Sequence, residues 1–390
     1  MKTHNRIKTA VILTTAATTI VTLATKRQKA NSYIREVTVH FVDPQHPMYC
    51  AGANKHSKFR IYAKYIKISL LNEVPNFDNE KIAELAMQLY GIEGEISSLP
   101  SFEDQNARIK TSAESYVLKI ANKRWAKEEL ELQTFVLEHL KTTAPELSCP
   151  QVIASKSGAA ITIVDGFAVR LFTFLEGKNL GEVLRSPELN HDIGHFMGRF
   201  TNAMQSFTHP VSERPNDFWN LDNVLACKIY LEDVIDEDVR ERIKGFYGRF
   251  EKNILPKLKH LRKTVVHGDA NEQNLLVAVD RPAKIAGLID FGDTQRATHI
   301  NDLAITLAYA LLGEDDFESV ARQIIKGYTE VFSLEPGELE VLFDLMAMRL
   351  IQSIILTSNS AKKFPDNKYI VSSQKPAQEL LKKLETYEWH

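Results

Sequence analysis

Two short segments of the chain bring together side chains that could carry out phosphoryl transfer. The first reads Val265-Val-His-Gly-Asp269 and continues to Asn274, and the second reads Ile285-Ala-Gly-Leu-Ile-Asp290. In each, an apolar run typical of a short strand precedes the polar side chains, which therefore lie at one edge of a small β-structure. One carboxylate there could accept the proton of an attacking hydroxyl, while an amide and a second carboxylate hold Mg²⁺ against nucleotide phosphates.

This spacing predicts specific roles for three residues. We expect Asp269 to be the catalytic base, and Asn274 and Asp290 to be the magnesium ligands. Either motif alone, His267-Gly-Asp or Asp290-Phe-Gly, is also typical of an ordinary turn. Both motifs in this order, each after an apolar run, are far more specific to phosphoryl transfer from a nucleotide, ATP or GTP.

A phosphate-binding lysine is expected on a strand upstream. Strand-like runs at 96–99, 106–110 and 116–121 follow one another, and the third places Lys119 in an alternating strand pattern. In kinases a lysine on the third strand contacts nucleotide phosphates and pairs with a helix glutamate. The helix predicted over 127–140 offers Glu131 as this partner and Glu128 as the second choice. Solvated helix charges are the alternative for both.

The loop between the first two of these strands contains no glycine. It reads Ser101-Phe-Glu-Asp-Gln105-Asn106, where protein kinases carry Gly-x-Gly-x-x-Gly. Phosphate contacts would then come from backbone N–H groups and from the side chains of Ser101, Gln105 or Asn106. The alternative is an ordinary polar hairpin.

Further elements are predicted around these residues. Asp78 can cap a helix over 78–90 that ends before Gly91. Asp165-Gly166 is typical of a hairpin turn between strands at 159–164 and 167–174. From about residue 191 apolar residues recur at helical spacing, so the rest of the chain is expected to be mainly helical. Asp302 is a natural helix-start residue, and we expect it to steady the catalytic loop.

Composition limits the possible functions. The 390 residues are 44% hydrophobic and 25% charged, as in a globular protein of two lobes. A net charge of −2 argues against a nucleic-acid partner. The three cysteines lie far apart without a Cys-x-x-Cys pair, which argues against a zinc site or disulfides and favours a reducing compartment. Because a nucleotide-dependent kinase also needs cytosolic ATP or GTP, we expect the protein to be cytoplasmic.

The N-terminal segment has a different character. A Thr-rich uncharged run at 9–25 lies between basic residues and resembles a signal peptide or weak membrane anchor, and an irregular stretch follows it. The run is shorter than the ~20 residues that a spanning helix needs, so no stable membrane span is expected. We interpret residues 1–71 as an extension outside the catalytic unit, with disorder, a signal-like segment or a misplaced start as alternatives.

The motifs resemble those of the aminoglycoside phosphotransferase and choline kinase superfamily. The residues that carry this resemblance are His267-Gly-Asp269-x4-Asn274, Ile289-Asp290-Phe-Gly-Asp293 and Val117-Leu-Lys119. Within the superfamily the chain is most similar to the hydroxylysine kinase family. Its shorter supporting strings are Ser98-Leu-Pro-Ser-Phe-Glu-Asp-Gln-Asn106, Glu131-Leu-Gln-Thr134, Phe218-Trp-Asn-Leu221 and Asn271-Glu-Gln-Asn-Leu275.

The resemblance, which covers about residues 75–385, implies a fold and an activity. The fold is α+β and bilobal, like that of protein kinases, with a small antiparallel-sheet N-lobe over 72–176 and a mainly helical C-lobe over 177–390. The implied activity moves the nucleotide γ-phosphate, with Mg²⁺ and with GTP favoured, to the side-chain hydroxyl of 5-hydroxylysine. Arg296 and Asp293 are candidates for contacting this amino acid, and a structural pair is the alternative for them.

Three other functions stay open at this point. The same chemistry could act on another small alcohol or amine, such as homoserine, choline, methylthioribose or an aminoglycoside. The glycine-free loop leaves room for a non-catalytic nucleotide-binding protein. Residues 9–25 alone suggest a membrane-tethered interaction protein.

Overall fold

The structure is a computed structural model that describes residues 6–14, 17–28, 31–41, 74–101, 104–214, 216–363, 368–371 and 373–387. The chain divides into two compact units, Met1–Asn72 and Glu73–His390. Among the helices in these described ranges, none is both long enough and apolar enough to cross a membrane.

The first unit contains a three-stranded antiparallel sheet. Its strands are β1 (Arg6–Thr14), β2 (Ala17–Gln28) and β3 (Asn31–Phe41), in the order β1-β2-β3. Threonine, valine and isoleucine are frequent in these segments, and their branched side chains favour extended backbone. The described part of the Thr-rich run therefore lies in β1 and β2, and part of the stretch expected to be irregular forms β3.

The second unit begins with a helix and an antiparallel sheet. Helix α1 (Asn79–Leu85) continues as a π-helical turn (Ala86–Tyr90); Asp78 caps its start and Gly91, at φ 75°, ends it, as predicted. The sheet has the order β4-β5-β6-β9-β7, and β8 pairs with β9. Its strands are β4 (Glu95–Leu99), β5 (Gln105–Lys110), β6 (Ser115–Ala121), β7 (Val152–Ile153), β8 (Thr162–Val164) and β9 (Phe167–Thr173).

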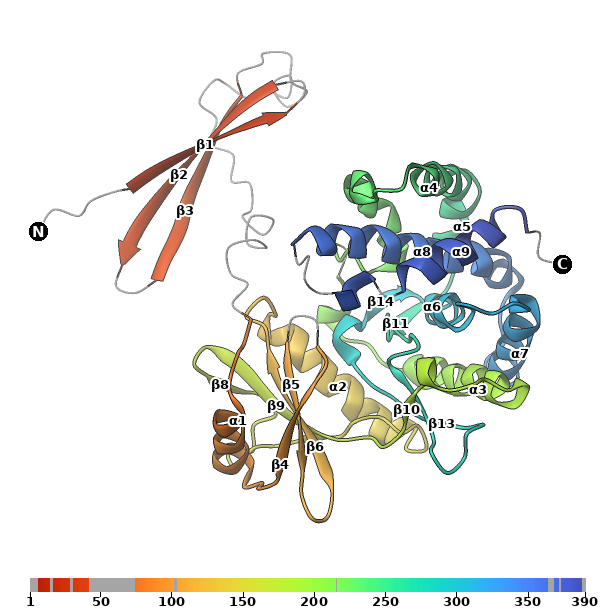
Figure 1. The fold of residues 1–390 in the computed structure, drawn as a ribbon, viewed down its shortest axis with the longest axis horizontal. Helices are drawn as coiled ribbons and strands as arrows, with labels where there is room; N and C mark the ends of the chain where they lie inside the picture. The colour runs from red at the N-terminus through yellow and green to blue at the C-terminus, as the bar shows by residue number, and fades with distance from the viewer. Residues whose placement is uncertain are drawn as a thin grey trace, which may run out of the picture. The chain divides into compact units, whose positions relative to one another are not determined.

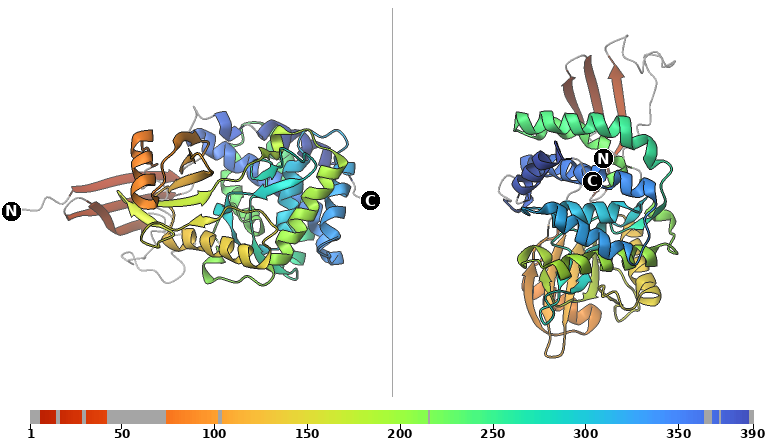
Figure 2. Two further views of the ribbon diagram at one scale, coloured as in Figure 1. Left: turned by 90° about the horizontal axis from the view of Figure 1, so that it is seen from below. Right: turned by 90° about the vertical axis from the view of Figure 1, so that its right-hand side faces the viewer.

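Alternation along β6 and β9 sends side chains to two faces of the sheet. Leu118 and Leu171 lie opposite each other and are buried in a small core that also contains Ile82 and Leu85 of α1. The adjacent pair, Lys119 and Arg170, must point to the other face. Helix α2 (Lys127–Thr143) runs along the sheet (Figures 1 and 2).

The remainder of this unit is mainly helical and also contains short strands (Figure 1). Its longer helices are α3 (Pro187–Met204), α4 (Glu237–Arg249), α6 (Asn301–Ala310), α7 (Phe317–Thr329), α8 (Pro336–Lys363) and α9 (Gln374–Leu384). The shorter elements are β10 (Lys178–Asn179), a 3-10 segment (Leu221–Asp233), α5 (Leu255–Leu258), β11 (Lys263–Val266), β12 (Leu275–Val277), β13 (Ile285–Leu288) and β14 (Gln295–Thr298). β11 pairs with β14, and β12 lies between β10 and β13.

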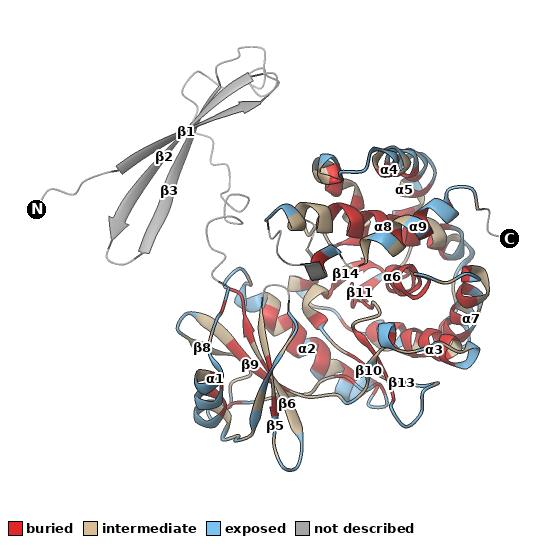
Figure 3. Ribbon diagram, in the orientation of Figure 1, coloured by how far each residue is buried: buried red, intermediate tan, exposed pale blue. Residues whose placement is uncertain are grey.

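One large core fills the helical part. It contains the whole of α6, where all ten residues are buried, and the middle of α8 (Figure 3). Helices α3 and α7 approach so closely that a Cβ added at Gly194 would lie 1.8 Å from the carbonyl oxygen of Ile324. Because that neighbour is backbone, only glycine fits there. The antiparallel sheet followed by a helical region confirms the predicted α+β, bilobal fold class.

Candidate active site

The predicted catalytic segment, residues 267–274, is a loop between β11 and β12, and we call it the catalytic loop. Gly268 lies at φ 82°, and a Cβ added to it would be 2.5 Å from the carbonyl oxygen of Asp293. A side chain at this position would therefore meet both backbone strain and a clash. The same contact brings Asp293 next to the residue that precedes Asp269.

A buried carboxylate holds the start of this loop. The two oxygens of Asp302 accept hydrogen bonds from the backbone N–H groups of His267 and Gly268, each at 2.9 Å. Asp302 is 1% exposed and lies in the first turn of α6. The expected structural role of Asp302 is therefore confirmed.

His267 connects the catalytic loop to the segment that carries Asp290. Its Nε2 lies 3.0 Å from the carbonyl oxygen of Ile289, and its Nδ1 lies 3.2 Å from the backbone nitrogen of Asp269. The carbonyl can only accept and the backbone N–H can only donate, so the ring carries its proton on Nε2. Burial lowers the pKa of His267 to about 4, which keeps the ring neutral.

The side chain of Asp269 accepts three hydrogen bonds from residues that the structure describes. Oδ1 accepts from Nη2 of Arg349 at 2.6 Å and from Nδ2 of Asn271 at 2.9 Å, and Oδ2 accepts from Nδ2 of Asn274 at 2.9 Å. Burial raises the pKa of Asp269, and the Arg349 charge opposes this shift. The neighbouring carboxylates Asp293 and Asp290 add to the increase.

The two predicted metal ligands offer oxygens of the type that Mg²⁺ prefers. Asn274 donates both of its amide hydrogens to Asp269, to the backbone carbonyl at 2.8 Å and to Oδ2, so its own Oδ1 faces away from that residue. Asp290 follows β13 and lies at φ 61°, in the left-handed region that only few residues adopt. Its side chain is 52% exposed and uses one oxygen for Lys119. An amide oxygen and an accessible carboxylate oxygen fit a divalent cation that retains water and phosphate ligands.

Lys119 lies 3.0 Å from Oδ1 of Asp290 and is 16% exposed in its side chain. This ammonium is the first cause of the lowered pKa of Asp290, which keeps the carboxylate charged. The predicted lysine and the predicted metal ligand therefore meet in one ion pair, although they come from different lobes of the fold.

The predicted partner of Lys119 is wrong. Glu131 instead pairs with Lys127 on its own helix at 3.0 Å, and its side chain is 39% exposed. Two positions further along α2, Gln133 is buried and accepts a 2.7 Å hydrogen bond from Arg170. Since side chains rotate by about 100° per residue around a helix, α2 turns Gln133 rather than Glu131 toward the sheet.

The predicted phosphate-loop residues have three different environments. Gln105 bonds the backbone of Phe77 with both ends of its amide, at 2.8 and 2.7 Å, so its side chain has a structural role that opposes the predicted phosphate contact. Asn106 lies opposite Lys119 in the β5–β6 register, and its buried Oδ1 has no hydrogen-bond partner among the described residues. Ser101 is exposed just after β4. Phe102 and Glu103 lie outside the described residues.

The two candidates for contacting substrate are not paired with each other. Arg296 pairs with Glu213 at 3.2 Å. Asp293 makes no side-chain hydrogen bond or ion pair to a described residue, and burial, with the Asp217 carboxylate second, raises its pKa to about 6. Asp293 therefore presents a carboxyl group beside the catalytic loop.

Arg349 is the residue that the sequence did not indicate. It lies in the middle of α8, 80 residues after Asp269, in a run of buried apolar residues. Its side chain is 1% exposed, and its charge lies over the rings of Trp219 and Tyr309, 4.8 and 5.5 Å from their centroids. The signal in the sequence is a lone arginine within an apolar stretch of a helix. This signal does not identify the residue with which the arginine pairs.

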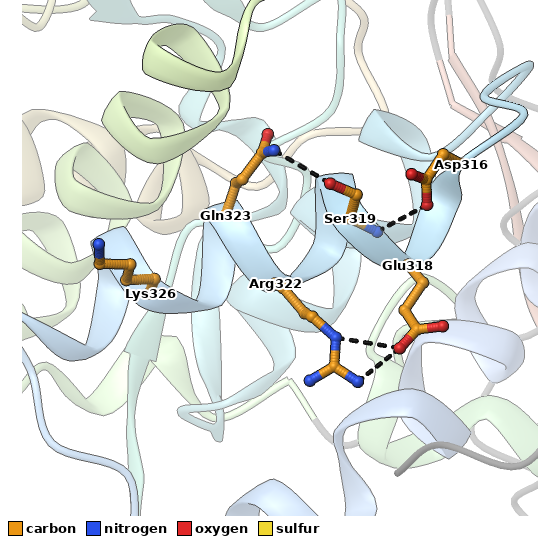
Figure 4. A pocket seen from close by; sticks show the side chains of 6 residues that line it. All are labelled: Asp316, Glu318, Ser319, Arg322, Gln323 and Lys326. Carbon is orange, nitrogen blue, oxygen red and sulfur yellow. Dashed lines mark hydrogen bonds and ion pairs between the residues drawn. The ribbon is translucent and has the colours of Figure 1, made fainter.

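A separate hollow of about 360 Å³ lies on the surface of α7 (Figure 4). It is lined by Asp316, Glu318, Ser319, Arg322, Gln323 and Lys326, all from the same helix and the residue before it. Two of its charged groups, Arg322 and Glu318, form an ion pair within the helix. None of the predicted catalytic residues lies in this hollow.

Comparison with known proteins agrees with this geometry. Residues 95–341 match the phosphotransferase enzyme family APH. Hydroxylysine kinase of Xenopus laevis is 29% identical over 327 residues, which cover 77% of this chain and 87% of the relative. The mouse (Mus musculus) hydroxylysine kinase is 28% identical over 337 residues, or 80% and 90% of the two chains. Homoserine kinase of Zymomonas mobilis is 29% identical and covers 65% of this chain and 78% of its own.

Solved structures share the fold at low sequence identity. An aminopropanol kinase associated with a microcompartment superposes with a TM-score of 0.62 at 16% identity, over 78% of this chain and 97% of its own. An amicoumacin kinase, solved with AMP-PNP, Ca²⁺ and amicoumacin, gives 0.61 at 16% identity, over 79% and 94%. The fold, the catalytic motifs and the match over 95–341 agree, and the chain belongs to the APH phosphotransferase family.

Proposed function

We propose that this protein is a cytoplasmic kinase that transfers the γ-phosphate of GTP or ATP to the side-chain hydroxyl of a small amino acid. The first candidate for this substrate is 5-hydroxylysine. The observation that carries the proposal is the convergence of Asp269, Asn274, Asp290 and Lys119 at one site, with Lys119 and Asp290 3.0 Å apart. The substrate comes from the hydroxylysine kinase relatives, which align over most of their own length.

Each residue has a distinct role in the proposed reaction. Lys119 would contact the nucleotide phosphates from the sheet, in the lobe over 72–176. Asn274 and Asp290 would hold Mg²⁺, which, when bound, offsets the charge that develops between the β- and γ-phosphates. Asp269 orients the substrate hydroxyl and accepts its proton. Most of the rate enhancement then comes from position and electrostatics, because the phosphoryl transition state is loose.

Proton acceptance requires an oxygen of Asp269 that the substrate can reach. The side chain of Asp269 is 23% exposed, whereas that of Arg349 behind it is 1% exposed. The raised pKa of Asp269, caused first by burial, makes its carboxylate a stronger base than an exposed aspartate. Both observations support the role of Asp269 as base.

A second candidate substrate is homoserine. The homoserine kinase of Zymomonas mobilis covers 65% of this chain at 29% identity. Both amino acids carry a side-chain hydroxyl, but hydroxylysine has an ammonium group on the neighbouring carbon and homoserine does not. The carboxyl group of Asp293 beside the catalytic loop, which has no ion-pair partner among the described residues, favours the substrate with the extra cation.

The test is a phosphate-transfer assay with the purified full-length protein. Mg²⁺ with ATP or GTP is combined with 5-hydroxylysine, homoserine, choline, methylthioribose and kanamycin, and the phosphorylated product is measured. Turnover of hydroxylysine at least ten times faster than of the other acceptors supports the proposal. Preferred turnover of homoserine would keep the mechanism and replace the substrate. Nucleotide binding without transfer to any acceptor would contradict the proposed kinase function.

A further inference from the structure

The two oxygens of the Asp269 carboxylate are not equivalent. Oδ1 accepts two hydrogen bonds, from Arg349 at 2.6 Å and from Asn271 at 2.9 Å. Among the described residues Oδ2 accepts one, from Asn274 at 2.9 Å. Because a carboxylate oxygen has two in-plane lone pairs, Oδ1 is saturated and Oδ2 retains one acceptor position.

Arg349 reaches this carboxylate from the interior of the protein. Its Nη1 donates to Oε1 of Gln352 at 3.1 Å, and Gln352 in turn donates to the carbonyl oxygen of Phe218 at 2.8 Å. The guanidinium also lies over the ring of Trp219. These contacts fix the position of the guanidinium group and therefore the direction from which Arg349 donates to Asp269.

A substrate cannot easily touch this arginine. The Arg349 side chain is 1% exposed and its Nε is buried without a hydrogen-bond partner among the described residues, while Asp269 is 23% exposed. The accessible side of the pair is therefore the carboxylate. An arginine that binds the carboxylate of an amino-acid substrate would need an exposed guanidinium group, and the guanidinium group of Arg349 is buried.

We propose that Arg349 is a positioning residue that occupies Oδ1 of Asp269 and leaves Oδ2 to take the proton of the substrate. This inference rests on the proposed function. In the step, the hydroxyl oxygen forms a bond to the γ-phosphorus, and the bond from that phosphorus to the bridging oxygen of the nucleotide breaks. The hydroxyl proton moves to Oδ2, and the electron pair of the broken bond stays on the nucleoside diphosphate.

Three variants at this position test the proposal. Arg349→Lys keeps a charge and one donor, Arg349→Met removes both at similar length, and Arg349→Ala opens space for guanidinium ion added to the solution. Arg262→Met is the matched control, because Arg262 makes a bidentate pair with the buried Glu338 away from the site. Folded fractions of all variants are compared by thermal unfolding before the kinetics are measured.

We expect Arg349→Met to lower kcat by roughly 10²–10³-fold, while KM for the nucleotide and the alcohol changes by less than about threefold, since only the alignment of the base is lost. Arg349→Lys should lose about tenfold, and guanidinium ion should restore part of kcat to Arg349→Ala but not to Arg349→Met. Arg262→Met should keep kcat within about threefold of the wild type despite a similar loss of stability.

Two results would overturn the proposal. A folded Arg349→Met or Arg349→Lys protein with wild-type kcat would remove any positioning role. A large increase in KM for the amino acid at constant kcat would instead make Arg349 a substrate ligand. Slow hydrolysis of the nucleotide without any alcohol, with water as acceptor, is measured in the same proteins. This measurement separates the positioning role of Arg349 from the proposed substrate. If hydroxylysine and homoserine are not substrates, replacement of Arg349 should still slow the hydrolysis reaction.

Discussion

Lys119 and Asp290 are 171 residues apart in the chain, yet Nζ of one lies 3.0 Å from Oδ1 of the other. One belongs to the central strand β6 of the sheet, and the other follows β13 in the helical part. This ion pair therefore joins the proposed phosphate-binding group directly to the proposed metal ligand. A bound nucleotide and its metal ion would both contact this pair. Substitutions of Lys119 and of Asp290 should therefore both weaken nucleotide binding.

Replacement of Lys119 tests the phosphate contact. We expect Lys119→Met to weaken nucleotide binding about tenfold or more, because a charge-assisted contact to phosphate contributes about 1.5–3 kcal/mol. Calorimetric titration with ATP and GTP in the presence of Mg²⁺ measures the effect. Lys284→Met is the control, since Lys284 pairs with Asp192 at 2.6 Å outside the site. Equal affinities for the two variants would argue against a phosphate contact.

Asp290→Ala tests metal binding. The variant should lose the Mg²⁺ dependence of nucleotide affinity, because a single amide oxygen from Asn274 is too weak a ligand set for Mg²⁺. The measurement is nucleotide affinity over a range of Mg²⁺ concentrations, compared with the same titration in EDTA. A variant whose affinity still rises with Mg²⁺ as in the wild type would show that the metal is held elsewhere.

Asp269→Asn tests the base. The amide keeps the size of the side chain but cannot accept a proton, so kcat should fall by roughly 10²–10⁴-fold. Nucleotide affinity should stay within about threefold of the wild type, because Lys119 and Asp290 are intact. Single-turnover transfer and equilibrium titration separate the two quantities. An unchanged kcat would rule out Asp269 as the proton acceptor.

The strands and the three carboxylates at this site could be predicted because the signals are local. Apolar runs of a few residues precede His267-Gly-Asp and Asp290-Phe-Gly, and Asp302 lies in the first turn of a helix. The orientation of α2 could not be predicted in the same way. Glu131 and Gln133 are two residues apart, and the rotation of the helix, which packing decides, determines which of them faces the sheet.

Arg349 shows a second limit of sequence reasoning. Its partner, Asp269, is 80 residues away, and no periodicity in α8 connects the two. Placing a charge within the apolar core is unfavourable unless a partner compensates it, so the arginine itself suggests a buried partner. Only the packing of α8 against the catalytic loop identifies Asp269 as that partner.

Asp302→Asn tests the support of the catalytic loop. The amide nitrogen would face one of the two backbone N–H groups that Asp302 now accepts at 2.9 Å, leaving a buried donor without an acceptor. We expect a loss of roughly 2–4 kcal/mol in the free energy of unfolding, measured with urea. Asp316→Asn, at the exposed start of α7, is the control and should lose at most about 1 kcal/mol. A loss no greater than that of the control would contradict the supporting role.

His267 should make stability depend on pH. Burial lowers the pKa of this ring from its ordinary 6.5 to about 4, so the unfolded chain binds a proton at a pH where the folded protein does not. Its contribution is constant above pH 6.5, falls as the pH drops below that value, and levels off below about pH 4. Between pH 7 and pH 5 the expected loss from this residue is about 2 kcal/mol.

The comparison of wild type with His267→Gln isolates the contribution of His267 to the pH dependence of the free energy of unfolding. The glutamine side chain can donate and accept but does not titrate, so the variant should lose about 2 kcal/mol less than the wild type between pH 7 and pH 5. Urea unfolding at both pH values gives the two differences, and the absolute stability of the variant does not enter. The imidazole is 0% exposed, with Nε2 3.0 Å from the Ile289 carbonyl oxygen. Identical pH dependence in the two proteins would therefore mean that the folded protein accepts a proton on this ring, which its burial opposes.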